Sequence, residues 1–189
     1  MTKKDLNQNA KFEQELINTF EPDFIFSEKP LNRFNSTKNN NNLEILNKAE
    51  KLSELKSKIN SIENCNLKNN SKNLILGDGN VNSSIMLIGE APGQEEDDSG
   101  LAFRGDVGKL LKKMLLAIQI KLENTYIAYS INFRTPEDRK PTSQEIKRYS
   151  TFLKEHISII NPKILILMGS TAMEAVTGLS NRISNERGN

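Results

Sequence analysis

Three short apolar runs dominate the hydrophobic pattern of the second half of the chain. They cover residues 85–88, 126–131 and 163–169, and each is short enough to be a buried strand. Helical patterns follow each run, so the predicted order is strand–helix–strand–helix–strand–helix. Short crossovers of this kind give a parallel sheet covered by helices on both faces. The sequence therefore predicts an α/β fold, namely a three-layer α/β/α arrangement with a short central parallel sheet.

The helix after the first run has the clearest periodicity. Its apolar residues recur at i, i+3, i+4, i+7, i+8 and i+11, which predicts a core-facing helix. These residues are Val107, Leu110, Leu111, Met114, Leu115 and Ile118. The next helix opens at Thr142–Glu145 with the residue types of a capping box, and Thr171–Glu174 repeats them before a last short helix.

The first 42 residues form an N-terminal arm with a different pattern. Apolar residues between Phe12 and Phe20 have the spacing of one helix face, which predicts a short helix. Residues 36–42 are polar and low in complexity, which predicts a flexible linker. A disordered tail is the alternative, so we expect a partly disordered helical extension.

The remainder, residues 43–189, is expected to be the globular domain. It begins with an amphipathic helix over Leu43–Ile62. Residues 77–80, Gly-Asp-Gly-Asn, are typical of a turn.

Two loops follow the carboxyl ends of predicted strands. In the first, residues 89–105, a Gly-Pro-Gly segment is followed by four acids and then by Phe103. The second, residues 132–141, carries two prolines and three basic residues. Such loops meet at one edge of a parallel sheet, where α/β folds build ligand sites. An acidic pocket beside a basic rim suits chemistry on a nucleic acid. A generic phosphate or nucleotide binder fits nearly as well, and solvated surface acids are the plainer alternative.

Charge and composition exclude several classes of site and of protein. The net charge is +2, but residues 1–100 carry a balance of −4 and residues 101–189 a balance of +6. The single cysteine, Cys65, excludes an internal disulfide and an all-cysteine metal cluster held by one chain. The only histidine, His156, is expected on a helix face rather than as a ligand. No apolar run approaches a membrane span, and the charged N-terminus lacks a signal-peptide core, so we expect a cytoplasmic protein.

Several motifs, in the right order, resemble those of family-4 uracil-DNA glycosylases. Residues 89–97, GEAPGQEED, are similar to the first family motif, GEAPGxxED. AFRG at residues 102–105 resembles the segment PFxG, and residues 134–142 resemble the loop RPPxNRxPT. Glu186-Arg187-Gly188 is similar to the family segment LRG. The resemblance runs from about Cys65 to Gly188.

The resemblance implies removal of uracil from DNA by N-glycosidic hydrolysis, as in base-excision repair. A flipped-out uracil would stack on Phe103, and Glu96 would stabilise the sugar cation or orient water. Glu90 would line the pocket as the second candidate catalytic residue. The rest of the uracil pocket would comprise Gly89, Ala91, Pro92, Gly93, Tyr129 and Asn132. The cations Arg134, Arg139 and Lys140 would contact DNA phosphates.

The chain departs from the family pattern at three places. The family commonly holds an iron–sulfur cluster with four cysteines, but only Cys65 remains, while Lys68, Phe133 and Tyr149 stand near the other positions. We therefore expect no cluster and no metal. The asparagine with which the family reads uracil is replaced by Tyr129. The family's last strand and histidine motif are expected to be missing.

Two functions follow as alternatives. The first is a uracil-DNA glycosylase with DNA containing uracil as partner. Its activity is expected to be either impaired by the missing last segment or completed by a separate C-terminal fragment. The second is a catalytically inactive remnant that at most binds DNA. In either case we expect a monomer.

Overall fold

The computed structural model describes residues 33–180 and 183–186. The chain divides into two compact units, residues 1–40 and 41–189, and the second carries the candidate site. The helix predicted between Phe12 and Phe20 lies outside the described residues. Within them, no helix is both long and apolar enough to cross a membrane.

Helix α2, Arg33–Asn60, begins ten residues before the helix predicted from Leu43. It therefore includes residues 36–42, for which the sequence predicted a flexible linker. The residues of α2 include neither proline nor glycine, so no strong helix breaker separates the polar segment from the amphipathic one. Low complexity alone did not identify the boundary of the helix.

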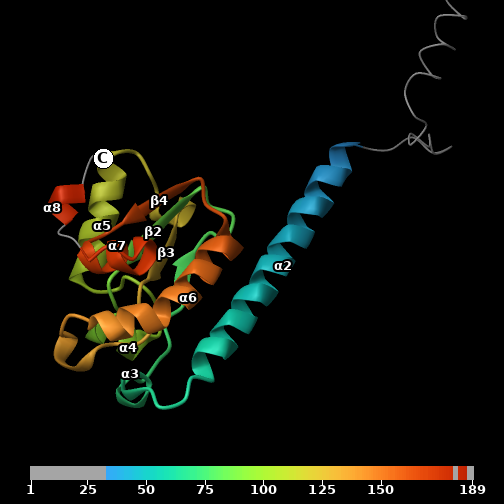
Figure 1. Cartoon of the computed structure of the whole chain (residues 1–189). Coiled ribbons are helices and arrows are strands. Elements are labelled where there is room, and N and C mark those ends of the chain that lie inside the picture. The colour runs from blue at the N-terminus through green and yellow to red at the C-terminus, as the bar shows by residue number, and fades with distance from the viewer. Residues whose placement is uncertain (1–32, 181–182, 187–189) are drawn as a thin grey trace, which may run out of the picture. The chain divides into compact units, whose positions relative to one another are not determined.

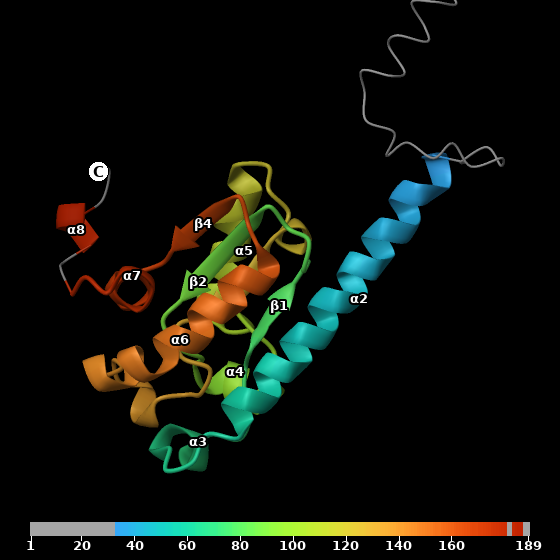
Figure 2. The ribbon, with the colours of Figure 1, turned by 45° about the vertical axis from the view of Figure 1, so that its right-hand side comes forward.

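The sheet has four strands in the order β1-β3-β2-β4. They are β1 (Gly77–Gly79), β2 (Ile85–Gly89), β3 (Tyr126–Tyr129) and β4 (Ile164–Leu167). Figure 1 labels β2, β3 and β4, and Figure 2 labels β1. Strands β2, β3 and β4 run parallel, with β2 in register with both neighbours. The remaining helices are α3 (Asn66–Asn70), α4 (Gln94–Ser99), α5 (Asp106–Ala117), α6 (Ser143–Ile160), α7 (Ser170–Thr177) and α8 (Ile183–Glu186), with the 3-10 turns η1 (Leu122–Asn124) and η2 (Pro136–Asp138). The prediction of an α/β fold is confirmed.

The sheet is mixed rather than wholly parallel, because β1 pairs antiparallel with β3. The turn predicted at residues 77–80 is therefore wrong: Gly77–Gly79 is a short edge strand. The glycines permit a close approach of the two backbones, since a β-carbon on Gly77 would lie 2.6 Å from the carbonyl oxygen of Ile127. The glycines that suggested a turn are therefore explained by the close approach of β1 to β3.

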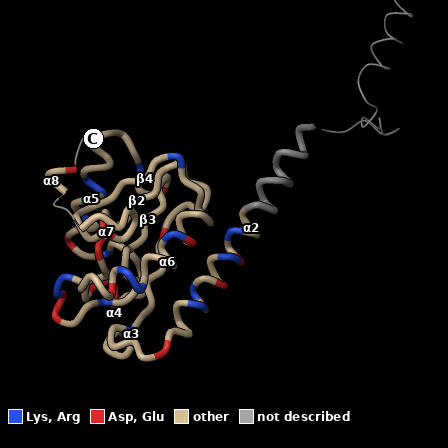
Figure 3. The backbone as a smooth tube through the Cα atoms, viewed as in Figure 1, with Lys and Arg blue, Asp and Glu red and all other residues tan. Residues whose placement is uncertain are grey.

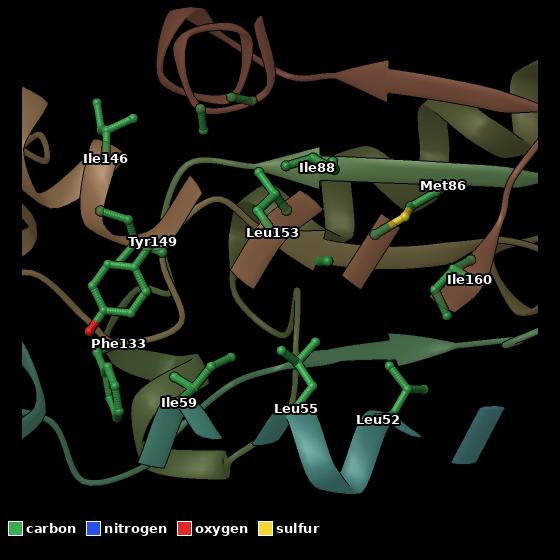
Figure 4. Packing of buried hydrophobic residues seen from close by; sticks show 14 of the residues in the cluster. Leu52, Leu55, Ile59, Met86, Ile88, Phe133, Ile146, Tyr149, Leu153 and Ile160 are labelled. Atoms are coloured by element: carbon green, nitrogen blue, oxygen red, sulfur yellow. The ribbon is translucent and has the colours of Figure 1, made fainter. Parts of the chain in front are cut away.

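Alternate side chains of the central strands point to opposite faces of the sheet, and each face has its own hydrophobic core. Met86 and Ile88 of β2 pack with Leu55 of α2 and with Tyr149 and Leu153 of α6 (Figure 4). On the other face, Leu87 and Ile127 pack with Leu111 and Leu115 of α5. Figure 2 shows α6 and α5 on opposite sides of the sheet. The three-layer arrangement is thus confirmed.

Only part of the predicted core-facing stripe of α5 is buried. Leu111 and Leu115 lie in the core, but Val107, Leu110, Met114 and Ile118 are exposed. Ile164 and Ile166 of β4 are exposed as well, and within the described residues β4 pairs only with β2. Periodicity identified α5 as an amphipathic helix, but four of the six residues predicted to face the core are exposed, because periodicity does not show how much of an apolar face a neighbouring element covers.

Helix α6 begins with the predicted capping box. The Thr142 hydroxyl accepts from the Glu145 backbone N–H, and the Glu145 carboxylate accepts from that of Thr142. Farther along α6, the His156 side chain is buried and its Nε2 lies 3.0 Å from the hydroxyl of Tyr126 on β3. Burial lowers the pKa of His156 to about 4, because the imidazolium would lose its hydration.

We predict that the free energy of unfolding falls as the pH is lowered from about 6.5 towards 4. The folded pKa lies below that of an unfolded histidine, about 6.5, so stability is full above that pH and is lost below it. The full loss is about 3 kcal/mol. Urea unfolding at a series of pH values measures it. The variant His156→Gln should show a flatter profile in this window; an equally steep profile would assign the loss to other groups.

Candidate functional site

The two predicted loops both begin at the edge of the sheet where β2 and β3 end. The Ser130 backbone N–H and hydroxyl both donate to the carbonyl oxygen of Gly89, each at 2.8 Å. The Ile131 N–H donates to the Glu90 carbonyl oxygen at 3.2 Å. Helix α7 begins at the same edge, after β4. The charged residues of these loops are marked in Figure 3.

A hollow of about 370 Å³ lies at this edge. Its volume falls within the range of small-ligand sites, roughly 300–1,000 Å³. The structure brings together in its lining seven of the predicted pocket and catalytic residues: Gly89, Glu90, Ala91, Gly93, Glu96, Phe103 and Tyr129. Sequence reasoning missed four lining residues, Gly105, Asp106, Val107 and Met168. Their place at the ends of elements could have identified two of them, because Asp106 is the first residue of α5 and Met168 directly follows β4.

Two predicted pocket residues do not line the hollow. Pro92 is buried in the turn after β2, and Asn132 is 4% exposed. The side-chain amide of Asn132 donates to the backbone carbonyl oxygen of Ile75 at 3.0 Å, and the backbone carbonyl oxygen of Asn132 accepts from the Ile75 N–H. Asn132 therefore joins two backbone segments, and its amide is already engaged.

Two of the four consecutive acids are buried rather than solvated. Glu96 is 7% exposed, and its carboxylate accepts from the backbone N–H groups of Gly93, Arg104 and Gly105 at 2.9–3.0 Å. Asp97 accepts in the same way from the N–H groups of Lys72 and Asn73. These bonds satisfy buried donors, and they fix both ends of the segment that carries Phe103.

Glu90 has a different environment. It is exposed, and one oxygen of its carboxylate accepts from the Thr171 hydroxyl at 2.5 Å. The capping box predicted at Thr171–Glu174 is thereby wrong, because α7 begins at Ser170 with Gly169 as its cap. The Thr171 hydroxyl bonds Glu90 across the site instead of the start of its own helix. Glu90 is the predicted carboxylate that remains accessible.

The Phe103 ring stacks on the ring of Tyr129. The two ring centroids are 4.7 Å apart and the planes differ by 2°. The Phe103 N–H also donates to the Tyr129 hydroxyl at 3.0 Å, and burial raises the pKa of that hydroxyl above its usual value. Gly89 permits this arrangement, since a β-carbon there would lie 2.9 Å from the Phe103 ring.

The cations of the second loop are largely paired within the protein. Arg134 binds both carboxylate oxygens of Asp138, at 2.7 and 2.9 Å. Arg139 binds Glu145 in the same bidentate way and lowers the pKa of Glu145 to about 2. The Lys140 ammonium lies 3.3 Å from the Ser170 hydroxyl, and no carboxylate of the described residues pairs with it.

The region around Cys65 is packed as ordinary core. The Cys65 sulfur lies 3.1 Å from the hydroxyl of Tyr149, and Tyr149 contacts Phe133 edge to face. One thiol beside two aromatic rings does not fit a cluster that needs four cysteine thiolates. Across the described residues, no group of three or more metal-ligating side chains is placed to hold a metal ion.

Comparison with known proteins identifies the family. The model of the Uracil DNA glycosylase superfamily matches residues 76–188, which include the hollow and both loops. The chain belongs to this superfamily. A type-4 uracil-DNA glycosylase of Thermotoga maritima is 38% identical over 126 residues, 66% of each chain. Another, of Archaeoglobus fulgidus, is 33% identical over 130 residues, 69% of this chain and 65% of that protein.

The match thus spans about two thirds of the length of these glycosylases. A third relative is the DNA polymerase of Bacillus phage SP01. It is 30% identical over 105 residues, 55% of this chain and 11% of the polymerase. The glycosylase-like segment therefore also matches part of a much longer protein.

We predict that Glu96→Gln destabilises the fold by about 1–3 kcal/mol, because an amide cannot accept from all three backbone donors. The neighbouring variant Glu95→Gln is the matched control, since Glu95 is exposed, and it should change stability by less than about 0.5 kcal/mol. Urea unfolding measures both. Equal stability of the two variants would contradict the structural role of Glu96.

Proposed function

We propose that this protein removes uracil from DNA by hydrolysing the N-glycosidic bond. The main supporting observation is that an accessible carboxylate and an aromatic ring line one hollow at the strand ends, inside the segment that matches the superfamily. The basic loop follows β3 at the same edge of the sheet, although none of its residues lines the hollow. Base excision requires these three features, because the base must leave the stack, enter a pocket and be cut from a sugar that becomes positively charged. The glycosylase names of the two relatives support the same reaction.

We assign the catalytic carboxylate to Glu90. As the bond to uracil breaks, a nearby carboxylate stabilises the cationic sugar or orients the attacking water. Glu90 can do so because its side chain is exposed. The Thr171 hydroxyl binds one oxygen of the carboxylate and orients it, which leaves the other oxygen for the sugar or the water. Glu96 already serves three backbone donors, so its contribution is to hold the loop that presents Phe103.

DNA is the proposed partner, and Lys140 is the proposed primary phosphate contact. Lys140 is exposed and lies beside Ser170 at the start of α7, close to the Thr171 that holds Glu90. Arg134 and Arg139 would have to leave their carboxylate partners before binding phosphate directly. Their ion pairs shape the loop, while Lys140 offers a free charge at its surface.

Four further expectations belong to this proposal. No iron–sulfur cluster takes part, which the single thiol at Cys65 supports. The monomer is the working unit, because one chain supplies the whole described lining of the hollow. A separate polypeptide segment covers the edge of β4, where Ile164 and Ile166 are exposed. The proposed location is the cytoplasm, where the unpaired cysteine would remain reduced.

A catalytically inactive DNA-binding protein is the second candidate. The observation that favours it is the stacking of Phe103 on Tyr129, which leaves Phe103 8% exposed and Tyr129 5% exposed. An aromatic ring that receives a base must offer one of its faces. The basic loop would still bind DNA in such a protein.

We predict that the purified chain converts uracil in single- and double-stranded oligonucleotides to alkali-labile abasic sites. The variant Glu90→Gln should lower the single-turnover rate by roughly 10²–10³, because it removes charge stabilisation from the transition state. Glu95→Gln should keep the wild-type rate. Absence of cleavage by the wild type, with or without an added C-terminal glycosylase segment, would support the inactive candidate.

We predict that Lys140→Gln weakens binding of single-stranded DNA to a similar extent for all sequences. The slope of log affinity against log salt should fall by about 1, since one fewer counterion is released. Fluorescence anisotropy at several salt concentrations measures this slope. Lys121→Gln is the control, because Lys121 is exposed at the end of the sheet where β3 begins. An unchanged slope for Lys140→Gln would remove this residue from the DNA interface.

A further inference from the structure

We propose that the Tyr129 side chain occupies the stacking position of an incoming base, and that it determines whether a pyrimidine can enter the hollow. This inference rests on the proposed function, because it concerns the same hollow. It adds a residue that controls access and specificity. Its basis is the geometry of the Phe103–Tyr129 pair and the position of that pair in the lining.

The two rings have the relation that a bound base would have to Phe103. Aromatic rings and bases prefer offset stacks with nearly parallel planes. The Tyr129 ring lies within 2° of parallel to Phe103, at a centroid separation of 4.7 Å. The described residues form three other aromatic pairs, and these are edge-to-face or tilted rather than stacked. The stack is therefore specific to the pair that lines the hollow.

Neither ring has a free face in this arrangement. Phe103 is 8% exposed and Tyr129 is 5% exposed, and both pack with Leu87, Leu111 and Ile127 in the core on the α5 side of the sheet. A base could stack on Phe103 only after the Tyr129 ring had moved. Both rings nevertheless line the hollow together with Glu90, so removal of the Tyr129 ring would open space beside the proposed catalytic carboxylate.

Tyr129 is also held firmly in place. Its hydroxyl accepts from the Phe103 N–H at 3.0 Å. Phe103 has a φ of +53°, a left-handed conformation that is unfavourable for a non-glycine residue. Such a conformation persists where the surroundings determine it, and the Tyr129 hydrogen bond and ring stack contribute to that. Opening the hollow must break both contacts.

The test compares binding of free uracil to the full chain and to two variants, measured by calorimetry or by ligand-observed NMR. Tyr129→Ala removes the ring and should bind uracil at least tenfold more tightly than the wild type. Tyr129→Phe is the matched control: it keeps the ring and loses only the hydroxyl, so the stacking position stays filled and uracil should bind much more weakly than to Tyr129→Ala. Circular dichroism verifies that each variant is folded.

Three outcomes would overturn the inference. These are equal affinity of the wild type and Tyr129→Ala, tight binding by Tyr129→Phe, and no uracil binding by any of the proteins. If Tyr129→Ala does not fold, Tyr129→Asn replaces it. If neither variant folds, the wild type decides alone, because a dissociation constant below about 1 mM contradicts a filled stacking position and a weaker one supports it.

The same variants separate this inference from the proposed activity. Uracil binding by Tyr129→Ala without cleavage of uracil-containing DNA by any of the proteins would support the role of Tyr129 and reject the excision function. Cleavage by the wild type together with equal uracil affinity in the wild type and Tyr129→Ala would do the reverse.

Discussion

The shape of the site depends on the three backbone hydrogen bonds of the buried Glu96 carboxylate. These bonds join Gly93, at the start of α4, to Arg104 and Gly105, directly before α5. The intervening segment carries Phe103, so the position of the ring follows from the position of the carboxylate. An unpaired carboxylate could not be buried there without a large desolvation cost, which the backbone donors offset. Glu90 and Phe103 can border one hollow because Glu96 closes this loop.

This arrangement separates two roles that the sequence motif places side by side. Glu90 and Glu96 both belong to the GEAPGQEED segment, and both were predicted to act in catalysis. In the fold, Glu90 follows β2 directly and is exposed, whereas Glu96 lies in the first turn of α4 with its oxygens occupied. The motif identified a functional loop. Both acids line the hollow, and only the backbone path shows that Glu96 holds the loop while Glu90 stays accessible.

The sequence predicted the elements well and their surroundings less well. Apolar runs of strand length and helical periodicity identified the core elements of the α/β fold, and the order of the elements predicted that both loops share an edge. The antiparallel strand β1 was missed, because Gly77–Gly79 has no apolar side chain that could signal a strand. The exposure of Leu110 and Met114 was missed because burial depends on a neighbouring element, which periodicity does not report. The pairing of Tyr129 with Phe103 was missed because the two residues are 26 positions apart.

Because Cys65 is buried, its reactivity reports local opening of the packing around it. It is the only thiol in the chain, it is 4% exposed, and it lies against the Tyr149 hydroxyl where α3 meets α6. A thiol reagent cannot reach it until this packing separates, so the rate of alkylation follows the frequency of that opening. The folded chain should therefore resist thiol-directed labelling, and any dye that becomes attached marks molecules in which this side of the domain has come apart.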